Sequence, residues 1–397
     1  MDVSDQTIIL WTSELTWELL DKIPAVGVLR SESATVTNLE PLPITGPQSQ
    51  AWQVMSGQNP GQSGYFDSWL PRQYIVQPVS EPETMLLREA ITAAGRTAVW
   101  VDLTMAEVPE YLKALAPSVN RLVIRVAASD DLAAIDRAVE AGRSWAGSDG
   151  AFFLLSDHQT AAVKCYVNLN DALRALDVLD VSAPNTISWE ETLAYHVGHG
   201  QIWINLAGRE PEGVIAPGDE YDQTCQALVR SLPARLLDPQ SGEPVVERIY
   251  CRNELYQGDY LFRAPDLIAV LRPGYAPSPK SIMSGLDGAA VWPVPAGTRA
   301  AAGLHPMTVS GLALAVGAPF APGQVVAQSS LINIAPTILH TLHLAVPANM
   351  NGNVIVDLFT SAFMQQHPAQ RTDPGSNLSS EDEEEILARL KSLGYLG

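Results

Sequence analysis

The stretch Ala151–His158, which reads Ala-Phe-Phe-Leu-Leu-Ser-Asp-His, constrains the fold of this chain more than any other. Five apolar residues in a row, preceded by glycines, predict a short strand that is buried on both faces. The run ends in Ser156, Asp157 and His158. A buried parallel strand delivers such residues to the carboxyl edge of a sheet, where α/β proteins build their sites, and Asp and His are natural metal ligands. The alternative interpretation is a polar strand end that caps the next turn.

The chain before this stretch alternates between strand and helix patterns. Strands are predicted at Thr7–Trp11, Ala98–Leu103 and Arg121–Ala127, and helices at Thr16–Leu20, Thr84–Ala94, Pro109–Leu115 and Asp130–Trp145. This alternation predicts a largely parallel sheet with helices on both faces. Residues 41–60 are dense in Pro, Gly, Gln and Ser and are predicted to form a loop.

The regular alternation of strand and helix patterns ends after His158. A hairpin, or a strand with a flanking loop, is predicted over Thr192–Asn205. Helices are predicted over Tyr221–Leu236 and Ile332–His343, and strands over Leu267–Leu271 and Leu312–Val316. His196 and His199 lie three residues apart in the hairpin, where structural histidines are commoner than a metal pair. We interpret His340 and His343 as surface or packing residues of their helix.

Composition excludes several classes of function. The 397 residues include 44 Asp and Glu against 24 Lys and Arg, a formal charge of −20, which argues against nucleic acid or an anionic membrane as partner. No window approaches eighteen uninterrupted apolar residues, so no membrane span is predicted. The acidic start of the chain lacks the basic region of a signal peptide, and the three cysteines are widely spaced. We therefore expect reduced thiols and a cytoplasmic location.

Several short runs, in order, carry a resemblance to a known family. They are Leu155–His158, Asn205–Gly213, Asp238–Val246, Glu254–Gly258, Ala264–Asp266, Gly303–His305, Asn333–Leu339 and Leu393–Leu396. From about Ala151 onward the chain resembles the type I phosphodiesterase/nucleotide pyrophosphatase branch of the alkaline phosphatase superfamily. The resemblance implies a three-layer α/β fold, with a central sheet flanked by helices and a reduced cap or insertion. It also implies phosphate or sulfate ester hydrolysis with two metals, commonly zinc, and a Thr or Ser nucleophile.

The predicted organisation has three parts. Residues 1–363 form the α/β domain, with a cap-like subregion inserted at approximately 160–260. A polar tether follows over residues 364–380, and a helix over residues 381–397 closes the chain. Ser380 and Glu383 form a capping box for that helix.

The family's catalytic positions are mostly substituted in this sequence. The first-strand Asp ligand falls on Ser13, beside Glu14, and the nucleophile position falls on Pro47 or Gln48. Thr45 and Ser49 would compete for that role only if the loop had slipped. The family's His before Gly is Ser63 here. Its Asp-x-x-x-His pair becomes Asp130 or Asp131 followed by Ala134 or Ile135, so Asp130 or Asp131 is a metal-ligand candidate and the histidine is lost.

The retained ligand positions are Asp157, His158 and His305. In the family the first two hold one metal and the last holds the other, so each site has lost about half of its ligands. We therefore interpret the chain as a catalytically impaired protein, a pseudoenzyme that binds a protein partner, an active paralogue or a ligand, and no cofactor is expected. The alternative is a divergent metal-dependent phosphodiesterase or phosphohydrolase that uses the remaining Asp and His ligands to hold zinc or manganese. Phosphate binding without turnover, through Arg209 and Arg252, is the third hypothesis. The sequence does not indicate an oligomeric state.

Overall fold

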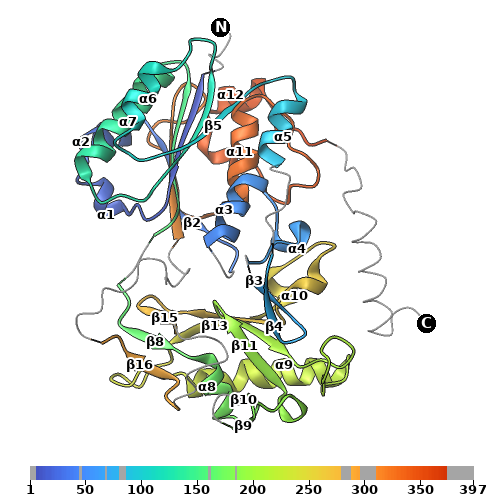
Figure 1. Ribbon diagram of the computed structural model, residues 1–397. Coiled ribbons are helices and arrows are strands. Elements are labelled where there is room, and N and C mark those ends of the chain that lie inside the picture. The colour runs from blue at the N-terminus through green and yellow to red at the C-terminus, as the bar shows by residue number, and fades with distance from the viewer. Residues whose placement is uncertain are drawn as a thin grey trace.

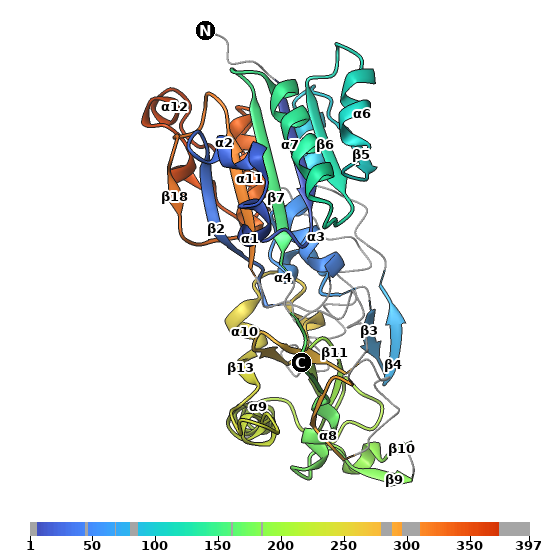
Figure 2. The same ribbon diagram turned by 90° about the vertical axis from the view of Figure 1, so that its left-hand side faces the viewer.

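The computed structural model describes residues 6–43, 47–67, 69–79, 86–159, 162–183, 186–278, 288–295 and 310–372. The predictions that concern Thr45, His305 and the C-terminal helix 381–397 lie outside these ranges. Two lobes are visible in Figures 1 and 2, a larger one built on the central sheet and a smaller one built on short sheets.

The central sheet has the strand order β18-β2-β17-β7-β1-β6-β5, with β19 also paired to β2. Its strands are β1 (Thr7–Thr12), β2 (Ala34–Glu40), β5 (Val99–Leu103), β6 (Arg121–Val126), β7 (Ala151–His158), β17 (Ser310–Val316), β18 (Val325–Val326) and β19 (Ser329–Ser330). Strands β7, β1, β6 and β5 are mutually parallel, as the alternation of strands and helices predicts. β2 pairs in parallel with β18 and β19, and among the described strands β17 alone runs antiparallel to its neighbours, β7 and β2. The sheet is therefore mixed, and it is largely parallel as predicted.

Helices cover both faces of this sheet. One layer contains α1 (Trp17–Leu20), α2 (Pro24–Arg30), α6 (Val108–Ala114) and α7 (Leu132–Ala146). The other contains α3 (Pro47–Ser56), α5 (Leu86–Ala93), α11 (Ile334–Thr341) and α12 (Ser361–Gln366). Alternate residues of β1 serve the two layers: Ile8 and Leu10 pack with the first, Ile9 and Trp11 with the second. The predicted three-layer α/β fold is confirmed.

The prediction of a loop over residues 41–60 is wrong for most of that segment. The chain forms α3 and then α4 (Pro60–Ser63). Pro47 occupies the first position of α3, where a proline costs no hydrogen bond. Val54 and Met55 of α3 are buried in the same core as α11 and the sheet. Burial of this apolar face favours the helix despite the Gln and Ser residues in it.

The smaller lobe carries three short sheets. Its strands are β8 (Cys165–Val167), β9 (Val181–Ala183), β10 (Thr186–Ile187), β11 (Ala194–Gly198), β12 (Gln201–Ile204), β13 (Val246–Cys251), β14 (Leu267–Leu271), β15 (Tyr275–Pro277) and β16 (Val291–Pro293). Its helices are α8 (Leu169–Arg174), α9 (Asp219–Ser231) and α10 (Arg252–Leu255). The predicted hairpin is confirmed as β11–β12. β12 and β13 both pair with β14, so this lobe continues past residue 260.

The hairpin of β3 (Trp69–Arg72) and β4 (Ile75–Pro78) lies between α4 and α5 in sequence. In space it lies beside the smaller lobe. Tyr74 at its turn stacks on Trp189, with ring centroids 3.7 Å apart. Its hydroxyl donates to Asn205 Oδ1 at 2.7 Å. The N-terminal part of the chain is thereby fastened to the smaller lobe.

At the other end, α12 extends to Gln366, so the first residues of the segment predicted as a tether are helical. Arg371 donates to the carbonyl oxygen of Met350 at 2.7 Å and to Asn353 Oδ1 at 3.0 Å. The chain therefore stays attached to the domain through these residues. Within the described ranges, no helix is long and apolar enough to cross a membrane.

Candidate functional site

The carboxyl edge of the central sheet brings Asp157 and His158 of β7 next to the turn after β1. All eight residues of β7 are buried. Asp157 Oδ2 accepts a hydrogen bond from the indole of Trp11 at 3.1 Å, and its Oδ1 lies 2.8 Å from His158 Nδ1. The two predicted ligands are thus brought together, and each is already engaged with a protein group.

Backbone contacts hold the turn after β1 against the end of β7. Glu14 N donates to the carbonyl oxygen of His158 at 2.8 Å, and Leu15 N donates to Ser156 Oγ at 3.2 Å. Glu14 adopts a positive φ of 69°, an uncommon conformation for a residue with a side chain. Ser13, the position predicted for the substituted first-strand ligand, lies in the same turn. The end of β7 and the turn after β1 therefore meet at one edge of the sheet.

Electrostatics at this edge favour a charged imidazole. Burial lowers the pKa of His158, but the hydrogen bond and charge of Asp157, followed by the charge of Glu14, outweigh it. The net result is a pKa raised above the ordinary value of histidine.

The residues predicted to occupy the nucleophile position, Pro47 or Gln48, lie at the first turn of α3. Neither side chain can attack phosphorus. Ser49, the nearest described hydroxyl in sequence, is 1% exposed, and its Oγ donates toward the carbonyl oxygens of Phe66 at 2.8 Å and Tyr65 at 3.2 Å. Its proton is directed at backbone acceptors and away from any substrate. Ser63 ends α4 and its Oγ accepts from Tyr65 N at 3.3 Å, a local turn contact.

The residues predicted to replace the family's Asp-x-x-x-His pair lie at the start of α7 and within its first turn, and they serve the fold. Asp131 caps this helix, accepting from the backbone N–H groups of Ala133 and Ala134 at 3.0 and 3.1 Å. Asp130 is exposed beside it. Ala134 and Ile135 are 3% and 0% exposed and pack in the core. A histidine is excluded at either position unless the core rearranges.

The described residues do not fit a metal centre of the family's kind. Structural and catalytic zinc sites use three or four protein ligands. No group of three or more His, Cys, Asp or Glu side chains with that geometry occurs in the described part of the chain. Asp157 and His158 supply two donors; His305, the third retained position, lies outside the described residues.

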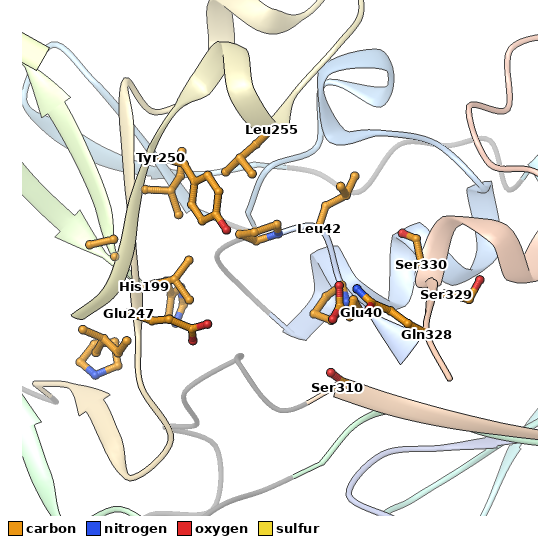
Figure 3. A pocket seen from close by; sticks show the side chains of 18 residues that line it. Glu40, Leu42, His199, Glu247, Tyr250, Leu255, Ser310, Gln328, Ser329 and Ser330 are labelled. Carbon is orange, nitrogen blue, oxygen red and sulfur yellow. The ribbon is translucent and has the colours of Figure 1, made fainter. Parts of the chain in front are cut away.

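A pocket of about 730 Å³ opens between the same edge of the central sheet and the smaller lobe (Figure 3). Glu40, Ser310 and Ser330 come from the ends of β2, β17 and β19, and β13 contributes Glu247 and Tyr250 from the opposite wall. His199, from the turn between β11 and β12, lies on the wall of Glu247. These residues come from distant parts of the chain, so no local sequence pattern reveals the pocket.

His199 is held by a side chain that the sequence analysis missed. Its Nδ1 lies 2.8 Å from Oδ2 of Asp67, and Gln201 Nε2 donates to the same oxygen at 3.0 Å. Asp67 is 2% exposed. His199 has a positive φ of 46°, which directs this turn residue toward the pocket wall. The neighbouring His196 is fully buried; burial, and then the charge of His199, lower its pKa to about 3. His196 is therefore a neutral core residue, consistent with a structural histidine.

The motifs that carry the resemblance mostly build the smaller lobe. Asn205 Nδ2 donates to carbonyl oxygens of Trp189, Thr192 and Glu212. Asp238 Oδ1 accepts from Gln240 N and Ser241 N in a tight turn. These contacts fix the loops of the smaller lobe, so these motif residues have a structural role.

Comparisons with known proteins agree with this architecture. The family model for type I phosphodiesterase/nucleotide pyrophosphatase matches residues 109–285. Among solved structures, murine ectonucleotide pyrophosphatase/phosphodiesterase 5 is similar, with a TM-score of 0.53 and 11% sequence identity over 89% of this chain and 100% of that chain. An inactive variant of that murine protein in complex with AMP matches with the same values. No curated protein matches this sequence. At this identity the structural likeness shows the fold, and with the family model it confirms the predicted resemblance.

Proposed function

We propose that this chain, whose fold is that of the type I phosphodiesterase/nucleotide pyrophosphatase branch of the alkaline phosphatase superfamily, is a catalytically impaired protein that binds rather than turns over. The proposal is supported by the residue types at the predicted nucleophile position, Pro47 or Gln48 at the start of α3, because neither has an attacking hydroxyl. Ser49 does not substitute for it, because its hydroxyl is buried and bonded to backbone carbonyl groups. The binding target would be a ligand, a protein partner or an active paralogue.

Metal content and turnover test this proposal together. The purified protein and the variants Asp157→Ala and Asp157→Asn would be measured by elemental analysis and with bis(4-nitrophenyl) phosphate as a general diester substrate. We expect near-zero metal in all three proteins and hydrolysis no faster than the buffer. The Asn variant keeps the shape of Asp157 and its acceptor for the Trp11 indole, so it controls for folding. One equivalent of zinc or manganese that disappears in both variants, together with turnover, would overturn the proposal.

A second candidate function is a divergent hydrolase with one zinc or manganese ion. It is favoured by Glu14, whose backbone N–H bonds to the carbonyl of His158 and whose charge acts on that imidazole. Asp157, His158 and a repositioned Glu14 would be the three protein ligands that a catalytic zinc needs. The variant Glu14→Gln separates the two functions: it would lower metal content and turnover in a hydrolase and change neither in a binding protein.

We also propose a reducing, cytoplasmic location. Cys165, Cys225 and Cys251 are all free thiols in the structure. Burial raises the pKa of each of these thiols, which keeps them protonated and unreactive. A thiol titration of the native and the denatured protein would count them: fewer than three thiols after denaturation would contradict this location.

A further inference from the structure

We propose that the pocket between the two lobes binds a small organic cation with an apolar body. This inference rests on the proposed function, since it names the ligand class of a protein that binds without turnover. The pocket of about 730 Å³ is large enough for a ligand of that size.

Apart from the imidazole of His199, the ionisable side chains of the described lining are carboxylates. Glu40 and Glu247 stand on opposite walls. No Lys or Arg belongs to the described lining. An anionic phosphate ester would therefore enter a negative field, whereas an ammonium group would be attracted from either wall.

Arg248 follows the lining residue Glu247 in sequence, and its positive charge is balanced by the carboxylate of Glu254. It lies 4.3 Å from the ring centroid of Tyr250 and pairs with Glu254 at 2.7 Å. The contact also shows that the Tyr250 ring accepts a cation, because the face of an aromatic ring carries partial negative charge. Tyr250 itself lines the pocket.

His199 lies on the wall of Glu247, and its Nδ1 is 2.8 Å from Oδ2 of the buried Asp67. This contact fixes the imidazole ring in the wall of the pocket, so a ligand meets the ring in a set position.

The walls between these polar groups are apolar. Leu42, Leu255, Ile268, Val270 and Pro277 line the pocket. Apolar area that a ligand removes from water contributes favourably to binding. An aromatic or branched aliphatic body on the ammonium group would therefore add affinity that a bare inorganic cation cannot.

Calorimetric titration with benzyltrimethylammonium tests the inference, with benzylphosphonate as the anion of similar body. The variants are Glu247→Gln and Glu40→Gln, which remove one pocket charge each and keep the shape. Glu190→Gln is the matched control, because Glu190 is an exposed residue of the smaller lobe that does not line the pocket. We expect binding at about millimolar concentration or tighter, as the small size of the probe allows. Each pocket variant should weaken it about fivefold, and salt should weaken it further.

Three results would overturn the inference: no heat of binding up to about 10 mM probe, equal affinity in Glu247→Gln, Glu40→Gln and Glu190→Gln, or benzylphosphonate binding as tightly as the cation. None of them bears on turnover. Diester hydrolysis that Asp157→Ala abolishes would instead overturn the proposed function, whatever the cation does. The two failures are therefore distinguishable.

Discussion

Asp266 is the acceptor at the centre of a buried charged group in the smaller lobe. Arg209 Nη1 and Nη2 donate to its two oxygens at 2.9 and 2.6 Å, and Tyr221 donates from its hydroxyl at 2.9 Å. Both partners of the ion pair are 5% exposed or less. Burial raises the pKa of Asp266, but the charge and hydrogen bonds of Arg209 outweigh it and hold the pKa below its ordinary value. The pair stays ionised in the core.

Removing one partner of this pair should be costly. Arg209→Met leaves the Asp266 carboxylate buried without its main counter-ion, and we expect the free energy of unfolding to fall by about 3–5 kcal/mol. The double variant Arg209→Met/Asp266→Leu should lose less than Arg209→Met alone, because the Asp266 carboxylate is then absent; Glu210, the other buried partner of Arg209, is unpaired in both variants. Urea denaturation measures both. Lys113→Met breaks the exposed pair with Glu110 and should cost about 1 kcal/mol at most. Equal losses in Arg209→Met and Lys113→Met would contradict this account.

His340 gives the stability a pH dependence. Burial, and then the charges of His343 and His367, lower its pKa to about 4. The unfolded chain, with an ordinary pKa near 6.5, therefore binds more protons between pH 6.5 and pH 4. The stability that comes from neutral His340 is present above pH 6.5 and is lost as the pH falls through this window.

The measurement is the urea midpoint at pH 7.5, 6 and 5. His340→Phe keeps an aromatic ring against Phe359 and Phe363 and removes the titration. We expect the wild type to lose stability over this range and the variant to lose less. His196, whose pKa is also lowered, leaves some pH dependence in the variant. An identical pH profile for the two proteins would rule out this role for His340.

At the scale of elements, the β3–β4 hairpin is joined by a two-residue turn with strained backbone. Gln73 and Tyr74 have φ of 51° and 66°. Such turns match the twist of hairpins but favour Gly and Asn, since L-residues with a Cβ resist positive φ. Tyr74 is retained there by its stacking on Trp189, whereas Gln73 is exposed.

Gln73→Gly should therefore stabilise the protein by up to about 1 kcal/mol, because glycine adopts this conformation without a steric penalty. Thermal unfolding is a sufficient measurement. Gln77→Gly is the control: Gln77 is exposed in the adjoining strand β4, and glycine in a strand should destabilise. A lower melting temperature for Gln73→Gly would show that the turn is not strained in this way.

Elements were predictable where the pattern of apolar residues is local. β1, β5, β6, β7, α6 and α7 lie where their sequences predict them. α3 was not predictable, because its Gln and Ser residues resemble a loop and only packing of Val54 and Met55 against α11 favours the helix. The direction of β17 was likewise not predictable from its sequence. An apolar strand pattern indicates burial, but nothing in Leu312–Val316 tells whether the neighbouring strand runs the same way.

At the scale of the whole molecule, the edge formed by Asp157 and His158 was predictable because strand ends meet there regardless of the details of the fold. The pocket was not predictable. Its walls join Glu40, His199, Glu247 and Ser310, which are brought together only by the arrangement of two lobes. The pairing of Asp67 with His199 spans 132 positions of sequence and has no local signal.

The register of β7 and β17 places Ser310 directly opposite His158. The chain thus leaves the central sheet at His158 and returns to it at the neighbouring position of Ser310. The elements from β8 to β16 lie between these two residues in sequence. Such a connection can be lengthened, shortened or exchanged without altering the order of the sheet. The smaller lobe is therefore inserted between two neighbouring strands, and the pocket wall that it supplies can be altered while the larger lobe keeps its architecture.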